Sequence, residues 1–167
     1  MNLFILRHGL AIEPGTHRLS SDAERPLTPK GKQKVAEVAR AMKAMEISFN
    51  LILTSPYVRA KQTAEIVAAK LHAQKRLEFA DELKPGGSMD ELIERIREAD
   101  GAPENVLLVG HEPYLSNLIS LLVFGDMGAS ITLKKAGLCK VSAERLECGR
   151  CASLEWLLTA KVMGAIR

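Results

Sequence analysis

Residues 3–9 read Leu-Phe-Ile-Leu-Arg-His-Gly, so that four apolar residues are followed at once by an arginine and a histidine. A similar arrangement recurs at 51–56, Leu-Ile-Leu-Thr-Ser-Pro, and at 106–113, Val-Leu-Leu-Val-Gly-His-Glu-Pro. Short, uninterrupted apolar runs of this kind are typical of strands that are buried on both faces of a parallel sheet. Each of the three predicted strands therefore ends in a polar cluster.

Helical patterns lie between these runs. Residues 28–29, Thr-Pro, supply an N-cap and a proline at the first helical position, and residues 55–56, Ser-Pro, repeat this start signal. Residues 88–91, Ser-Met-Asp-Glu, form a capping box that opens another helix. The segment 113–124 is apolar nearly all round, which predicts a more buried helix.

The C-terminal part differs, because 131–133, 138–142 and 152–158 read as short strands separated by turns that contain glycine. We expect them to form a meander of two or three strands on the sheet edge. The preceding alternation of strand and helix predicts a mainly parallel sheet with helices on both faces. The predicted fold class is α/β, a three-layer α/β/α sandwich in which residues 1–167 form a single domain.

The composition is that of an ordinary globular protein: 167 residues, 47% hydrophobic, 26% charged, with a formal net charge of +3. Basic residues are spread among acidic ones, which argues against a nucleic-acid-binding or membrane-binding surface. No apolar run has the length of a signal peptide or a membrane span, so we expect a cytoplasmic protein. The three cysteines make a disulfide framework unexpected. The Cys-x-x-Cys spacing at 148–151 favours a turn over a metal or redox site, because a zinc site lacks further ligands.

The chemistry lies at the strand ends. In open parallel sheets, ligands bind beyond the carboxyl ends of the strands. Arg7, His8, Arg59 and His111 all follow predicted strands, together with the starts of two helices. Helix N-termini present free N–H groups, and arginine forks match phosphate oxygens. The sequence therefore predicts an anion site.

Each of the four residues has an ordinary alternative when it is taken singly. His8 could be a hydrogen-bonded core histidine, and Arg7 could form a surface ion pair. Arg59 could be an exposed helix residue, and His111 could hold a loop closed. Because all four would then lie at strand ends by coincidence, the shared site is favoured.

At this point a family resemblance becomes specific. The tripeptide at 7–9, Arg-His-Gly, resembles the signature of the histidine phosphatase (phosphoglycerate mutase-like) superfamily. Residues 55–64 are similar to the second arginine segment of that family, and residues 110–113 to its second histidine segment. The small size, the stretch 25–28, Arg-Pro-Leu-Thr, and the lack of an inserted cap domain resemble most the phosphohistidine phosphatase (SixA-like) branch.

This resemblance implies that His8 is the nucleophile and carries a transient phosphoryl group. Arg7, Arg59 and His111 would hold the phosphoryl oxygens, with Gly9 among the substrate-binding residues. A neutral imidazole is a competent nucleophile near pH 7, and a covalent intermediate divides one hard transfer into two easier ones. We expect no metal and no cofactor, because the fixed cations take the place of Mg²⁺.

The substrate depends on the general acid. Glu82 stands where esterases of the superfamily carry one, but a solvated loop carboxylate is the favoured interpretation. A phosphoramidate needs no strong acid, so the expected substrate is phosphohistidine on a partner protein. The alternatives are a broad phosphomonoesterase or sugar-phosphate phosphatase that uses Glu82, and a non-catalytic phosphate-binding module. His17 and Arg18, in the loop after the first strand, are expected to be exposed.

Overall fold

A computed structural model describes residues 1–15 and 21–166. Its centre is a six-stranded sheet in the order β3-β2-β4-β1-β5-β6. The first four strands in this order are parallel, whereas β5 runs antiparallel to both β1 and β6. The strands are β1 (Asn2–Arg7), β2 (Leu51–Thr54), β3 (Leu77–Phe79), β4 (Asn105–Gly110), β5 (Leu138–Ser142) and β6 (Ser153–Leu158).

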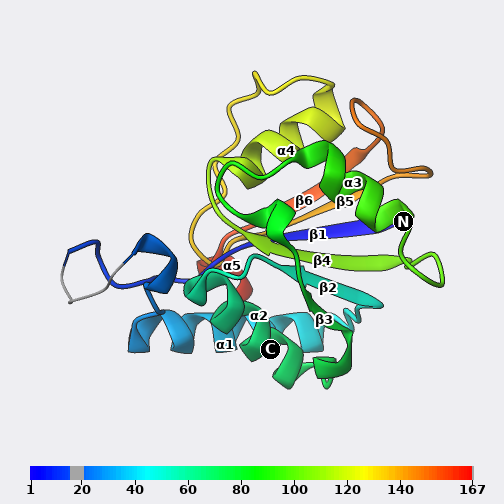
Figure 1. The fold of residues 1–167 in the computed structure, drawn as a ribbon. Helices are drawn as coiled ribbons and strands as arrows, with labels where there is room; N and C mark the ends of the chain where they lie inside the picture. Colours follow the sequence, from blue (N-terminus) through cyan, green and yellow to red (C-terminus); the bar gives the residue numbers. More distant parts are fainter. Residues whose placement is uncertain (16–20, 167) are drawn as a thin grey trace.

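Helices cover both faces of this sheet (Figure 1). The helices on one face are α1 (Pro29–Ala44), α2 (Val58–Lys70) and the short α5 (Ala160–Met163), and those on the other are α3 (Met89–Arg97) and α4 (Tyr114–Phe124). Three single-turn 3₁₀ helices complete the elements: η1 (Asp22–Glu24), η2 (Gln74–Arg76) and η3 (Asp81–Leu83). The predicted three-layer α/β/α arrangement is confirmed. No helix in the described residues is long and apolar enough to cross a membrane.

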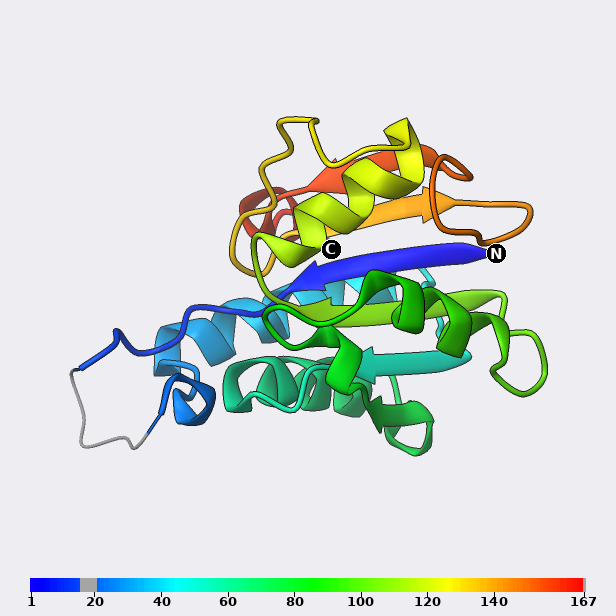
Figure 2. The same ribbon diagram turned by 45° about the horizontal axis from the view of Figure 1, so that its top comes forward.

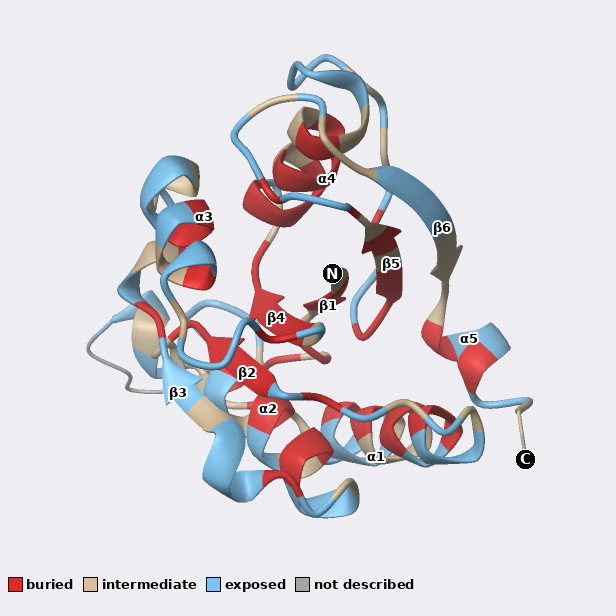
Figure 3. Cartoon of the chain, turned by 90° about the vertical axis from the view of Figure 1, so that its right-hand side faces the viewer, coloured by how far each residue is buried: buried red, intermediate tan, exposed pale blue. Residues whose placement is uncertain are grey.

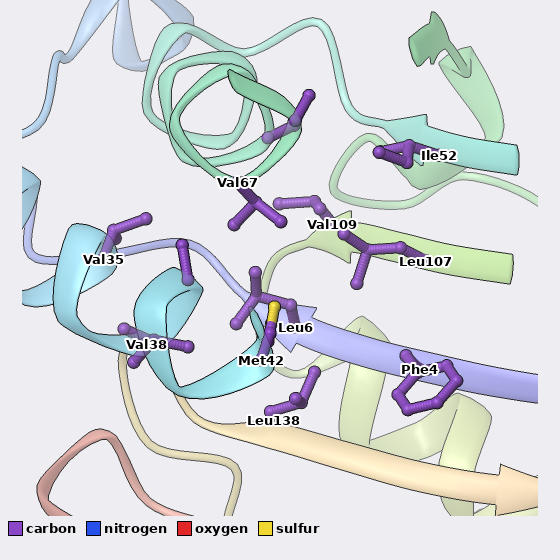
Figure 4. Close-up of a cluster of buried hydrophobic side chains, with 14 of the residues drawn as sticks. Phe4, Leu6, Val35, Val38, Met42, Ile52, Val67, Leu107, Val109 and Leu138 are labelled. Atoms are coloured by element: carbon purple, nitrogen blue, oxygen red, sulfur yellow. The ribbon is translucent and has the colours of Figure 1, made fainter. Parts of the chain in front are cut away.

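The sheet buries side chains on both faces, which explains the uninterrupted apolar runs. Along β1, Phe4 and Leu6 pack toward α1 and α2, whereas Leu3 and Ile5 pack toward α3 and α4. Successive strand residues point to opposite faces, so each strand contributes to two separate cores. Figure 4 shows the core on the α1 side, where Val35, Val38 and Met42 of α1 meet the strands. In Figure 3 the helices are buried toward the sheet and exposed on their outer sides.

Two of the three predicted helix starts are correct. Thr28 Oγ1 accepts a hydrogen bond from the Gly31 amide at 2.9 Å, and Ser88 Oγ accepts one from the Glu91 amide. The third was wrong, because α2 begins only at Val58 and its N-cap residue is Tyr57. Instead, the Ser55 amide donates to the Val109 carbonyl, and the Ser55 hydroxyl lies 2.8 Å from His111 Nε2.

The strand predictions need two corrections. The segment 131–133 is not a strand; it belongs to the loop that connects α4 with β5. The short edge strand β3, by contrast, was not predicted. The expected C-terminal meander is therefore β5 and β6 alone. Between them lies the bend at 148–151, where Cys151 Sγ hydrogen-bonds the backbone of Glu147 and both cysteines are free thiols.

The first turn of α1 packs closely on the chain that follows β1. A Cβ atom on Gly31 would lie 2.1 Å from the carbonyl oxygen of Leu10. We therefore expect Gly31→Ala to lower the free energy of unfolding by about 2 kcal/mol, because a backbone atom cannot move aside as a side chain can. Urea unfolding measures this change, with Lys32→Ala on the exposed side of the same helix as the control. Equal stability of the two variants would contradict the packing.

Candidate active site

The carboxyl ends of β1, β2 and β4 lie side by side (Figure 2). Arg7 pairs in register with Gly110, and Thr54 with Val109. The next residues continue the pairing: the His8 amide donates to the Gly110 carbonyl, and the Ser55 amide to the Val109 carbonyl. The residues that follow the three strands are thereby fixed next to one another, as the sequence predicted.

His8 is held in one tautomer. Its side chain is 7% exposed, and Nδ1 lies 2.7 Å from the carbonyl oxygen of Gly9. A carbonyl oxygen only accepts hydrogen bonds, so Nδ1 carries the proton and Nε2 carries the free lone pair. Arg59 Nε donates to this lone pair at 3.3 Å. The His8 imidazole therefore presents its unprotonated nitrogen toward an arginine.

The surroundings of His8 keep its ring neutral. Burial is the largest cause that lowers the pKa of His8 from 6.5 to about 4; the hydrogen bond to Gly9 opposes this shift, and the positive charges of Arg59, Arg7 and Lys135 contribute to it. At pH 7 the lone pair on Nε2 is consequently available. The cations that lower the pKa are also the groups that would attract a phosphoryl dianion.

Arg7 is anchored by the loop that precedes β5. Its Nη1 donates to the Leu133 carbonyl at 3.0 Å, and the Ala136 amide donates to the carbonyls of both Arg7 and His8. Nε of Arg7 is buried and has no hydrogen-bond partner among the described residues. A buried, unpaired N–H group is costly, so this donor is suited to an incoming anion.

Arg59 comes from the first turn of α2 and is 5% exposed. Besides Nε, which faces His8, its Nη1 donates to the Asp22 carbonyl oxygen at 2.7 Å and its Nη2 to Asp22 Oδ2 at 2.8 Å. The guanidinium also lies over the Tyr57 ring, 5.2 Å from its centroid. The sequence analysis did not identify Asp22, because its proximity to Arg59 depends on how the segment after β1 folds back.

His111 lies beside His8, with 5.2 Å between the ring centroids. Its Nε2 is 2.8 Å from Ser55 Oγ, and its Nδ1 is buried without a partner in the described part of the chain. Burial is the largest cause that lowers the pKa of His111 from 6.5 to about 3, and the adjacent His8, Arg59 and Arg7 contribute to this shift against the opposing charge of Asp22. His111 is thus neutral before an anion binds. With the proton on Nδ1 and the Ser55 hydroxyl donating to Nε2, it would offer a hydrogen-bond donor.

Comparison with known proteins identifies the family to which this chain belongs. The profile of the histidine phosphatase superfamily (branch 1) matches residues 3–85. The phosphohistidine phosphatase SixA of Escherichia coli K12 is 31% identical over 147 residues, which cover 82% of this chain and 88% of SixA. The chain belongs to the histidine phosphatase superfamily. A protein of uncharacterised function from Picosynechococcus sp. is 37% identical over 139 residues, or 83% of this chain and 82% of that protein.

Solved structures agree with this assignment. The protein histidine phosphatase SixA in complex with tungstate superposes on this histidine phosphatase with a TM-score of 0.81 and 26% identity, covering 96% of this chain and 98% of the other. A phosphohistidine phosphatase SixA structure from Nakamurella has the same fold at 20% identity, with a TM-score of 0.75 over 95% of both chains. The mixed sheet between helices is therefore the phosphoglycerate mutase-like fold, and the similarity supports the SixA-type branch.

Glu82 lies in η3, at the same edge of the sheet as the site, because the Ala80 amide donates to the Thr54 carbonyl. In the described residues, no hydrogen bond or ion pair joins its carboxylate to His8 or His111. Its carboxylate forms an ion pair with Arg95 Nη1 at 3.1 Å. Together with Arg95 it lines a cavity of about 880 Å³. A carboxylate paired in this way is not placed to protonate a leaving group at His8.

Gly9 packs closely against α1, and its predicted substrate-binding role stays a prediction. Its amide donates to Thr63 Oγ1 at 3.1 Å, so this N–H group is already paired. A Cβ atom at Gly9 would lie 2.6 Å from Val35 Cγ2, which shows why no larger residue fits between β1 and α1. His17 and Arg18 lie outside the described residues, and their predicted exposure stays a prediction.

Proposed function

We propose that this protein removes the phosphoryl group from phosphohistidine on a partner protein, through a covalent phosphohistidine intermediate at His8. The observation that supports this proposal best is the neutral, single-tautomer imidazole of His8, whose free Nε2 contacts Arg59. A pure phosphate-binding site gains nothing from such a nitrogen, because a lone pair repels a phosphate oxygen. A phosphoryl-transfer site needs one.

In the first step, His8 Nε2 attacks phosphorus, the bond from phosphorus to the leaving nitrogen breaks, and the leaving imidazole takes its proton from solvent. The forming phosphoimidazole is positively charged, and the Gly9 carbonyl, which accepts from Nδ1–H, stabilises that charge. Arg59 Nε and the unpaired Arg7 Nε would donate to the equatorial oxygens, where negative charge is concentrated. In the second step, a water molecule attacks phosphorus, and inorganic phosphate leaves as His8 Nε2 regains its lone pair.

The leaving group is inferred from the carboxylates around the site. Burial acts to raise the pKa of Asp22, but hydrogen bonds from Arg25 and Arg59 outweigh this effect and lower it, so Asp22 is ionised at neutral pH. Glu82 is paired with Arg95. Glu112, whose charge acts on Arg7, accepts a hydrogen bond from the Ser116 amide at 3.0 Å. Each of these three carboxylates is thus engaged by a donor, and none is free to protonate an alkoxide. The imidazole of phosphohistidine takes up a proton readily, so it can leave without a strong enzymatic acid. The similarity to SixA, a phosphohistidine phosphatase, supports the same substrate class.

The test compares phosphate release from a phosphohistidine-bearing protein with release from an aryl phosphate, for the wild type and for Glu82→Gln. We expect faster release from the phosphoprotein and no effect of Glu82→Gln on either substrate. Preferential ester cleavage that depends on Glu82 would instead indicate a broad phosphomonoesterase or sugar-phosphate phosphatase. Phosphate binding without release from either substrate would indicate a non-catalytic module.

A further inference from the structure

Asp22 occupies the outer edge of the Arg59 guanidinium. All three nitrogens of Arg59 have partners: Asp22 provides its backbone carbonyl to Nη1 and its carboxylate to Nη2, and His8 faces Nε. Two acceptors from one residue, at 2.7 and 2.8 Å, fix the plane of the guanidinium as a bidentate pair does. Only with this plane does Nε point at the nucleophilic nitrogen.

Asp22 is itself held in place. Arg25 Nη1 donates to Asp22 Oδ1 at 2.6 Å, and Arg25 Nε donates to the Ile12 carbonyl at 2.8 Å. The Arg25 amide also donates to the Asp22 carbonyl, closing the 3₁₀ turn of η1. The Asp22 side chain is 53% exposed, yet each of its carboxylate oxygens has an arginine partner. A side chain this exposed would otherwise sample several rotamers.

We propose that Asp22 is a positioning residue that acts through Arg59, keeping Nε of the guanidinium directed at His8 and at the phosphoryl group in transfer. This inference rests on the proposed phosphatase function of the same site. An arginine side chain without such a partner has many conformations. The free energy needed to order it would then raise the barrier of every turnover. Asp22 does not touch the reacting atoms; it orders a residue that does.

We expect Asp22→Ala to slow catalysis without weakening anion binding. We expect kcat for phosphate release to fall about tenfold to a hundredfold, because a misdirected guanidinium stabilises the transition state poorly. Removal of a negative charge beside Arg59 also removes repulsion toward a phosphate dianion. The inhibition constant of inorganic phosphate should therefore stay the same or decrease. A general loss of folded structure would weaken catalysis and phosphate binding together.

The chain offers a matched control. Asp81 is also the first residue of a 3₁₀ helix, its carbonyl also accepts from the amide three residues later, and its carboxylate pairs with Lys84 as that of Asp22 pairs with Arg25. Asp81→Ala thus removes a similar turn-closing carboxylate that has no contact with Arg59. We expect this variant to retain the wild-type kcat.

The deciding experiment is a double-mutant cycle with Arg59→Ala, measured as single-turnover phosphate release. Asp22→Ala should lower the rate at least tenfold in the wild-type background and less than twofold when Arg59 is absent. Equal losses in the two backgrounds, or no loss in either, would overturn the inference. Asp22→Asn, which keeps the shape of the side chain, serves the same cycle if the alanine variant does not fold. A wild-type protein that releases no phosphate would refute the proposed function itself, whereas turnover that Asp22→Ala leaves unchanged would refute only the positioning role.

Discussion

His8→Ala should lower the kcat for phosphate release by about four orders of magnitude or more, since removal of a covalent nucleophile leaves only binding and charge stabilisation. The remaining arginines can still attract the substrate, so its binding should be much less affected than its turnover. In wild-type protein quenched during turnover, an acid-labile, base-stable phosphoryl group should be found on His8. The variant should carry none. Phosphate release and phosphopeptide mapping together measure both effects.

His72→Asn is the control for this experiment. His72 is exposed, lies after α2, and has a positive φ of 55°, a backbone conformation that asparagine tolerates well. We expect wild-type turnover from this variant. Thermal unfolding of His8→Ala should confirm that the fold is retained, because the loss of one side chain at a strand end removes little of either core. Substantial turnover by a folded His8→Ala protein would exclude the covalent mechanism.

The positions of the four site residues were predictable because the signals that fix them are local. Arg7 and His8 follow an apolar run with no intervening residue, and His111 follows another after a single glycine. Parallel strands align their carboxyl ends at one edge of a sheet, so local placement after strands becomes proximity in the fold. The prediction for Arg59 also required that a helix follow β2, because Arg59 lies in the first turn of α2.

What the sequence could not show depends on long-range contacts. Asp22 reaches Arg59 across 37 positions of the chain, and no pattern around Asp22 marks it as different from its acidic neighbours. Ser55 looked like a helix N-cap, but its hydroxyl contacts His111. The edge strand β3 has three residues, and their side chains are partly or fully exposed. Such a strand is too short to show an alternation of apolar and polar residues. Ile131 and Leu133 are apolar because both pack against a core, and not because they pair with a strand.

Acidification should destabilise the protein well above the pH at which its carboxylates are protonated. The pKa values of His8 and His111 are about 4 and about 3 in the folded protein, against 6.5 in the unfolded chain. Below pH 6.5 these two histidines therefore bind protons in the unfolded chain but not in the native site, and the free energy of unfolding decreases as the pH falls. The two histidines together should reduce the free energy of unfolding by about 6 kcal/mol between pH 7 and pH 4, of which about 4 kcal/mol is lost by pH 5.

Urea unfolding at a series of pH values measures this slope, and the variants assign it. In the double variant His8→Asn and His111→Asn, the titrating groups are absent, so the free energy of unfolding should be nearly constant between pH 7 and pH 5. His72→Asn, at an exposed position outside the site, is the control variant. NMR gives a direct reading: the imidazole signals of His8 and His111 should not titrate between pH 8 and pH 5 in the folded protein. Midpoints near 6.5 for both rings would mean that the site is more hydrated than its burial indicates, and the pH slope would then need another origin.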